Sequence, residues 1–126
     1  MDKLSKLLKT QKELNDWIRK ERNLPEQTTE EQILQWTRCI THEVVELEDA
    51  FNWKHWKNKK DIDWFNVKEE AIDILHFLLS IFTDLGMTSD DVYNAYMDKN
   101  KENINRQLGK SEREGYKLDN IKKANA

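Results

Sequence analysis

Glycine and proline are almost absent from this chain: three glycines and one proline stand among its 126 residues. Globular proteins commonly use these two residues at a combined frequency of about 12%. Folds with many tight turns need them at their corners, so the composition disfavours a turn-rich all-β fold. We therefore predict an all-α fold, and the length of 126 residues favours a single domain.

The pattern of apolar residues and capping signals predicts four helices. Pro25 should end the first helix, Thr28 should cap the second, and Asn66 should cap the third. Gly86 should close the third helix in the C′ position. The predicted helices cover residues 3–22, 29–51, 67–85 and 90–108.

Two segments outside these helices differ in character. Residues 52–65 show no helical stripe, so they are predicted to form a connecting loop. Residues 109–126 have few apolar positions and should be mobile, or ordered only by a ligand or partner. We accordingly expect a helical domain over 1–108 and a C-terminal tail over 109–126.

The predicted third helix is apolar on nearly every side, because its apolar residues surround the cylinder instead of forming one stripe. Three other helices in so small a chain could hardly cover all of its faces. We therefore expect a four-helix bundle whose core is completed by a symmetric homodimer.

Composition also disfavours several classes of protein. The longest mostly apolar stretch, 74–82, falls well short of the ~20 residues that a membrane-spanning helix needs, and residues 1–12 lack the apolar core of a secretory signal. Cys39 is the only cysteine, which fits a reducing cytoplasm. The formal net charge of −3 disfavours a nucleic-acid partner. We expect a cytoplasmic protein that binds neither membrane nor nucleic acid.

Two acidic pairs are the first candidates for chemistry. Glu43 with Glu46, and Glu70 with Asp73, are each spaced i, i+3 and so project from one helix face. The second pair lies on the apolar third helix, where uncompensated carboxylates cost several kcal/mol. Either Lys or Arg side chains neutralise the pairs or one pair faces water, or a divalent cation binds between them. Oxygen ligands without a matching His or Cys set favour Mg²⁺ or Mn²⁺ over Zn²⁺, and Mg²⁺ commonly also binds phosphate oxygens.

The predicted fourth helix offers a complement to these acids. Lys99, Asn103 and Arg106 are spaced by four and three, so they share one face. Such a row can be a solvated surface, or it can bind the oxygens of a phosphate.

Amides and histidines form a second group of candidates. Gln11 and Asn15 fall within the apolar stripe of the first helix, as a polar edge of a helix interface or as groups that recognise a ligand. By position alone, a structural role for His76 in the third helix is favoured over a ligand-binding role.

Several motifs resemble a known enzyme superfamily. Glu43-Val-Val-Glu46 and Glu70-Ala-Ile-Asp73 resemble the metal motifs of the all-α, MazG-like nucleoside triphosphate pyrophosphatases. Three further segments resemble the dimeric dUTPases and the phage-type dCTP/dUTP pyrophosphatases: Trp53-Lys54-His55-Trp56, Asp73-Ile-Leu-His76-Phe77 and Lys99-Asn-Lys-Glu-Asn103-Ile-Asn-Arg106-Gln107. The resemblance implies a catalytic domain that cleaves a deoxynucleoside triphosphate to its monophosphate and pyrophosphate with Mg²⁺, or with Mn²⁺.

The resemblance also implies residue roles. Glu43, Glu46, Glu70 and Asp73 would bind metal, with Glu46 as the base that activates water. The phosphates would be bound by Lys99, Asn103, Arg106 and Tyr116. The base and sugar would be bound or bordered by Gln11, Trp53, Lys54, Trp56, His76 and Phe77.

Three functions follow as expectations. The first is Mg²⁺-dependent hydrolysis of dUTP to the monophosphate, with dCTP and dUDP as further candidate substrates. The second is a broad-specificity, house-cleaning pyrophosphatase of the same superfamily. The third belongs to a different class: a non-catalytic helical partner protein with a vestigial metal site.

Overall fold

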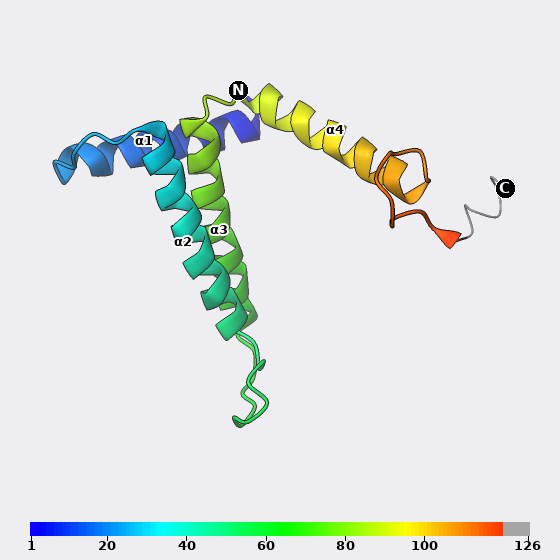
Figure 1. The fold of residues 1–126 in the computed structure, drawn as a ribbon. Coiled ribbons are helices and arrows are strands. Elements are labelled where there is room, and N and C mark those ends of the chain that lie inside the picture. Colours follow the sequence, from blue (N-terminus) through cyan, green and yellow to red (C-terminus); the bar gives the residue numbers. More distant parts are fainter. Residues whose placement is uncertain (120–126) are drawn as a thin grey trace. The chain divides into compact units, whose positions relative to one another are not determined.

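The computed structural model describes residues 1–119, and this part of the chain contains four α-helices and no strand (Figure 1). The all-α prediction is confirmed. The helices are α1 (Lys3–Glu21), α2 (Thr29–Asp49), α3 (Trp64–Asp84) and α4 (Ser89–Gln107).

The helix ends show how well local signals set the boundaries. The hydroxyl of Thr28 accepts the backbone N–H of Glu31 at 3.1 Å, as a capping residue should. Gly86 adopts a φ of +70°, the left-handed conformation expected just after a helix. The predicted cap at Asn66 is wrong: the Asp63 carboxylate accepts the Asn66 N–H at 3.1 Å, so α3 begins earlier, and because α2 ends at Asp49 the connecting loop covers residues 50–63.

The first compact unit, residues 1–88, contains α1, α2 and α3. Helix α3 packs against both α2 and α1. The most buried side chains of the described residues lie on α1 and α3, the helices that meet here, and two of the four are polar: Leu8, Gln11, Leu79 and Ser80. The polar pair at this junction is the first structural indication of a site there.

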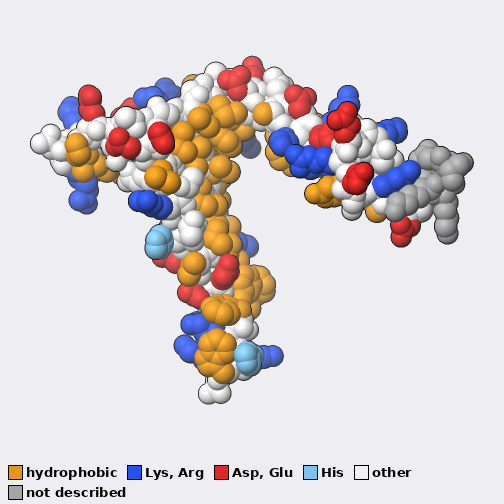
Figure 2. Space-filling model, viewed as in Figure 1, with side chains coloured by type: hydrophobic (Ala, Val, Ile, Leu, Met, Phe, Trp, Pro, Cys, Tyr) orange, Lys and Arg blue, Asp and Glu red, His pale blue; other side chains and the backbone are white. Residues whose placement is uncertain are grey.

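Much of the apolar surface of α3 stays uncovered within this unit. Phe65 is 71% exposed and Ile72 51%, and Leu85, the residue just after the helix, is 54% exposed. Figure 2 shows hydrophobic side chains along the α2–α3 pair. The homodimer that would cover this surface stays a prediction.

The second compact unit begins at Ser89 and contains α4 with the segment that follows it. That segment folds back on α4: the N–H of Leu118 donates to the carbonyl of Gln107 at 2.9 Å, and the Ser111 hydroxyl donates to Glu102 at 2.6 Å. The boundary expected between residues 108 and 109 stays a prediction, and residues 120–126 of the expected tail lie outside the described residues.

Over residues 1–119, no single helix is both long enough and apolar enough to cross a bilayer. The helices α3 and α4 reach the required length and apolar composition only when they are counted together, and a break in the chain separates them.

Candidate metal and nucleotide site

Helices α2 and α3 bring three carboxylates together in what we call the acidic cluster: Glu43, Glu46 and Glu70. One carboxylate oxygen from each lies within 4.8 Å of the other two. Glu43 and Glu46 meet because they are one helical turn apart on α2, and Glu70 faces them from α3. Asp73, the fourth predicted ligand, is not among the three, although its charge acts on both Glu43 and Glu70.

Burial and mutual repulsion disfavour the charged form of two carboxyls in the acidic cluster. Burial, followed by contact with Glu46, raises the pKa of the Glu43 carboxyl to about 7, and Asp73 adds a like charge. Burial also raises the pKa of Glu70, and the negative charges of Glu46 and Asp73 add to the effect. The cluster therefore favours protons or another positive charge between its oxygens.

The structure bears on one alternative for these acids, their neutralisation by Lys or Arg side chains. Within residues 1–119, no Lys or Arg forms an ion pair with the acidic cluster. One oxygen of Glu43 and one of Glu70, both named Oε2, are buried and accept no hydrogen bond from the described residues. Buried oxygens without partners are costly, and converging carboxylates are the ligand set that hard cations prefer. The acidic cluster therefore fits a divalent cation such as Mg²⁺ or Mn²⁺.

A cavity of about 490 Å³ lies beside the acidic cluster, among α1, α2 and α3. We call it the amide-lined cavity. Glu43 lines it and also belongs to the acidic cluster, and Asp73 lines it as well. Its other polar and aromatic walls are Gln11, Asn15, Arg19, Gln27, Gln35, Trp36, His76 and Phe77. A ligand in this cavity would thus lie next to the acidic carboxylates.

A directed hydrogen-bond network forms one wall of the amide-lined cavity. Nδ1 of His76 lies 2.6 Å from Oε1 of Gln11, and the Gln11 amide donates to Asn15 at 3.0 Å. The Asn15 amide donates to Ser80 at 2.9 Å, and the Ser80 hydroxyl donates back to the carbonyl of His76 at 2.9 Å. Since Oε1 of Gln11 can only accept, Nδ1 of His76 carries the proton.

Trp36 is a member of this site that sequence reasoning missed. Its ring stacks on Phe77 with the centroids 5.9 Å apart, and its N–H donates to Asp84 at 2.6 Å. The available signal was helical spacing: Trp36, Ile40 and Glu43 are separated by four and three residues, so they share one face of α2.

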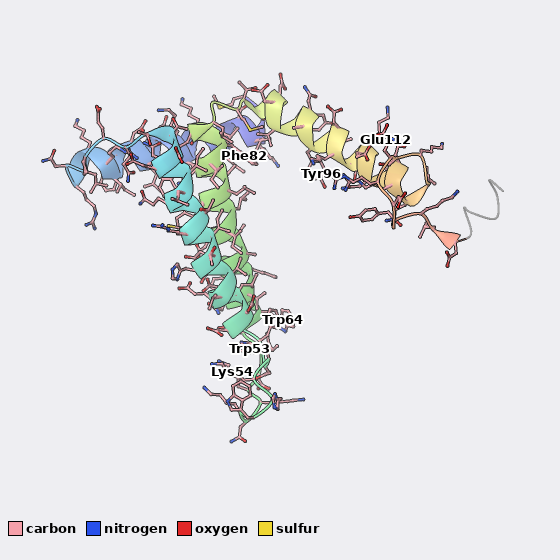
Figure 3. The ribbon with its side chains drawn as sticks, viewed as in Figure 1. Trp53, Lys54, Trp64, Phe82, Tyr96 and Glu112 are labelled. Carbon is pink, nitrogen blue, oxygen red and sulfur yellow. The ribbon has the colours of Figure 1, made fainter. Side chains whose placement is uncertain are left out.

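The aromatic motif after α2 lies elsewhere in the same unit. Trp53 and Trp56 are 54% and 65% exposed and pack edge to face, with the ammonium of Lys54 5.3 Å from the Trp53 ring centre. Figure 3 shows Trp53 and Lys54 together in the loop between α2 and α3. None of the three lines the amide-lined cavity, so this chain by itself does not bring them to the Gln11 and His76 network.

The predicted phosphate ligands belong to the second unit. There, Nη1 of Arg106 donates to the Asn103 side chain at 3.3 Å, and the guanidinium lies 5.6 Å from the Tyr116 ring centre. Arg106 also pairs with Glu102 at 3.3 Å. Lys99 precedes Asn103 by one turn and is exposed. Their role in binding phosphate stays a prediction.

A family model described as dUTPase matches residues 3–88. The chain belongs to the dUTPase family. The expected resemblance to the phage-type dCTP/dUTP pyrophosphatases is confirmed, and the wider MazG-like superfamily is consistent with it.

Similar curated proteins come from bacteriophages. A dCTP pyrophosphatase of Enterobacteria phage T4 is 36% identical, over 49% of this chain and 43% of the relative. A dCTP pyrophosphatase of Enterobacteria phage LZ5 is 34% identical over the same shares. A DNA replication protein of phage T4 is 35% identical, over 48% of this chain and 18% of the relative. The chain thus spans less than half the length of these relatives. No solved structure matches it significantly.

The dUTPase match ends at residue 88, where the first compact unit also ends. Every residue of the acidic cluster and of the amide-lined cavity therefore lies within the matched part. Lys99, Asn103, Arg106 and Tyr116 lie beyond it.

Proposed function

We propose that this member of the dUTPase family hydrolyses dUTP to dUMP and diphosphate, with Mg²⁺ as cofactor and Mn²⁺ as a substitute. The observation that carries the proposal is the position of Glu43, which belongs to the acidic cluster and also lines the amide-lined cavity. A base held in that cavity places its phosphates at the carboxylates. The dUTPase match and the phage dCTP pyrophosphatases support hydrolysis of a pyrimidine triphosphate.

The carboxylates would have separate tasks. Glu43 and Glu70, with their buried oxygens, and Asp73 would hold the cation together with Glu46. When bound, a divalent cation supplies Lewis-acid stabilisation of the charge on the phosphate oxygens. Glu46 is the exposed member of the cluster and is proposed to accept the proton of the attacking water. The oxygen of that water forms a bond to phosphorus, the P–O bond to the leaving group breaks, and dUMP and diphosphate result.

The hydrogen-bond network can offer two donors and one acceptor to a pyrimidine base. With its proton on Nδ1, His76 keeps Nε2 as an acceptor, and the Gln11 and Asn15 amides each keep one unused N–H. Uracil presents an N–H donor between two carbonyl acceptors, whereas cytosine presents its amino donor at one end, beside two acceptors. Both bases therefore need two donors and one acceptor, and only the order of these groups differs. We propose that the site places its acceptor between its two donors, an order that complements uracil and would leave polar groups unpaired with cytosine.

We propose further that the protein works as a homodimer. The exposed apolar residues of α3 support this, because a second copy would remove them from water. Size-exclusion chromatography with light scattering tests the proposal: a particle of twice 15.2 kDa is expected, and a monomer would contradict it.

A substrate panel tests the proposed function. The protein is incubated with dUTP, dCTP, the other dNTPs and dUDP with Mg²⁺, and release of diphosphate, or of phosphate from dUDP, is measured. We expect dUTP to be cleaved fastest. Equal rates on all dNTPs would favour a house-cleaning pyrophosphatase. Absence of both turnover and Mg²⁺-dependent binding of a non-hydrolysable dUTP analogue would favour a partner protein.

A further inference from the structure

Four residues of α1 and α3 form a circuit of hydrogen bonds that returns to its starting residue, and we call it the closed network. Nδ1 of His76 donates to Gln11, and the Gln11 amide donates to Asn15. The Asn15 amide donates to the Ser80 hydroxyl, and this hydroxyl donates to the backbone carbonyl of His76. The closed network therefore begins at the ring of His76 and ends at the backbone of the same residue.

Ser80 differs from the other members of the closed network in its position. Gln11, Asn15 and His76 line the amide-lined cavity, whereas Ser80 does not. The Ser80 side chain is 0% exposed, while His76 is exposed. Water can compete for hydrogen bonds at the His76 end, and it cannot reach the Ser80 end. A fixed direction of the closed network must therefore be set at Ser80.

The direction follows from the groups that Ser80 contacts. The carbonyl of His76 can only accept, so the Ser80 hydroxyl turns its single proton toward that carbonyl at 2.9 Å. Toward Asn15, Ser80 then offers lone pairs alone, and the Asn15 amide must present its nitrogen, at 2.9 Å. The amide oxygen of Asn15 consequently faces Gln11 and the amide oxygen of Gln11 faces Nδ1. One hydroxyl thus sets the orientation of two amides and the tautomer of His76.

Without that hydroxyl the closed network loses its direction. The oxygen and nitrogen of an amide occupy nearly the same positions, and either nitrogen of a neutral imidazole can carry the proton. In the reversed direction, Gln11 donates to Nδ1 of His76 and the imidazole proton moves to Nε2. Nε2 then changes from an acceptor to a donor, so the groups that the site offers to a base change as well.

We propose that Ser80 is a positioning residue for base recognition, which fixes the direction of the closed network and so keeps Nε2 of His76 an acceptor. The inference rests on the proposed function and deepens it, because it assigns the order of donors and acceptors at the base to a buried residue outside the amide-lined cavity.

Nitrogen-15 NMR of the full chain tests the inference without any nucleotide, because the shifts of the two imidazole nitrogens show which one carries the proton. Spectra are recorded with Mg²⁺ at pH 8, where an ordinary imidazole is neutral. The His76 signals are identified by their loss in His76→Gln. The unchanged protein should carry the proton on Nδ1, and Ser80→Ala should move a large part of the population to Nε2. Ser80→Thr, which keeps a hydroxyl that can bond the carbonyl one turn back, should restore Nδ1.

Thr83→Ala is the matched control. The Thr83 hydroxyl also donates to a backbone carbonyl of α3, that of Ser80, at 2.9 Å, and Thr83 does not line the amide-lined cavity. Both alanine variants should lower the Tm, and only Ser80→Ala should change the tautomer. An unchanged tautomer in Ser80→Ala, or the same change in Thr83→Ala, would overturn the inference.

A second variant keeps the test open where the buried substitution disturbs folding. Asn15→Ala cuts the closed network between Ser80 and Gln11 at a half-buried position. The His76 proton should move to Nε2 in this variant as well. Retention of the Nδ1 proton in Asn15→Ala would show that Ser80 does not control the tautomer.

Competition between dUTP and dCTP in one reaction is measured on the same variants, so the two proposals fail separately. Ser80→Ala should lower the ratio of dUTP to dCTP turnover about tenfold, and Ser80→Thr and Thr83→Ala should keep it. A changed tautomer with an unchanged ratio would contradict the role in base recognition. Turnover with tautomer and ratio both unchanged in Ser80→Ala would leave the function standing and remove the role of Ser80. A changed tautomer in a protein that cleaves no nucleotide would keep Ser80 as the residue that directs the closed network and remove the proposed function.

Discussion

The indole N–H of Trp36 donates to the carboxylate of Asp84 at 2.6 Å, which joins α2 to the last turn of α3. Beside this contact, the Gln32 amide fits between two charged groups, with its nitrogen 3.1 Å from the Asp84 oxygens and its oxygen 2.6 Å from Arg19. Asp84 does not line the amide-lined cavity, whereas Trp36 does. Asp84 thus lies outside the amide-lined cavity, and its hydrogen bond fixes the orientation of the Trp36 indole that lines it.

Replacement of Asp84 should therefore act through Trp36. Asp84→Ala removes the acceptor of the indole N–H, and we expect a KM for dUTP raised about tenfold with kcat changed much less, from a loss of roughly 1–2 kcal/mol. Asp84→Asn, which keeps an acceptor oxygen, should recover most of the affinity. Glu13→Gln, an exposed carboxylate on α1 that pairs with Lys9 alone among the described residues, serves as the control. An Asp84→Ala effect confined to kcat would contradict the positioning role.

Sequence reasoning predicted those features that depend on local chemistry. The spacing of Glu43 and Glu46 places both on one face of α2, and Thr28 and Gly86 mark helix ends, because each of these depends only on near neighbours along the chain. For Gln11 the sequence left two interpretations open, a polar edge of a helix interface and an amide that recognises a ligand; the structure shows that its side chain is buried, at 7% exposure.

Features that depend on tertiary packing could not be predicted in the same way. The Trp36 indole is part of the site only because Asp84 and Phe77 meet it from α3. The start of α3 was misplaced because two side chains, Asp63 and Asn66, can both cap a helix, and only the folded chain shows which one does.

Stability should fall as the pH rises if no cation is bound. The pKa of Glu43 is about 7 in the folded protein and near 4.5 in an unfolded chain, so the folded state binds more protons between these values. Unfolding is then increasingly favoured from about pH 4.5 to about pH 7, and the effect levels off above. Thermal unfolding at pH 5.5 and pH 8 measures this, with Glu43→Gln as the variant that lacks the titration.

Mg²⁺ should reverse this loss, because a cation replaces the protons between the carboxylates. Its addition should raise the Tm of the unchanged protein more at pH 8 than at pH 5.5, and by much less in Glu43→Gln. An equal rise in Tm for both proteins at both pH values would argue against a cation in the acidic cluster.

Glu46 and Glu70 should be needed for turnover but not for folding. Glu46→Gln keeps the size of the side chain and removes the proposed base, so kcat should fall by about 10²- to 10⁴-fold with unchanged far-UV circular dichroism. Glu70→Gln, which removes a cation ligand, should abolish turnover in the same assay. Glu48→Gln, an exposed glutamate on the same helix outside the acidic cluster, should keep full activity. Full activity in Glu70→Gln would remove α3 from the site.

Gln11 should set the preference between uracil and cytosine. Gln11→Leu removes the partner of Nδ1 of His76 and the donor to Asn15, so the histidine is free to change its tautomer and the directed network is broken. We expect kcat/KM for dUTP to fall by about tenfold or more and the ratio of dUTP to dCTP turnover to move toward one. The measurement is competition between the two nucleotides in one reaction, with Gln107→Leu on α4 as a control for the substitution itself. An unchanged ratio, with total activity lowered, would show that Gln11 supports the packing of α1 on α3 and does not recognise the base.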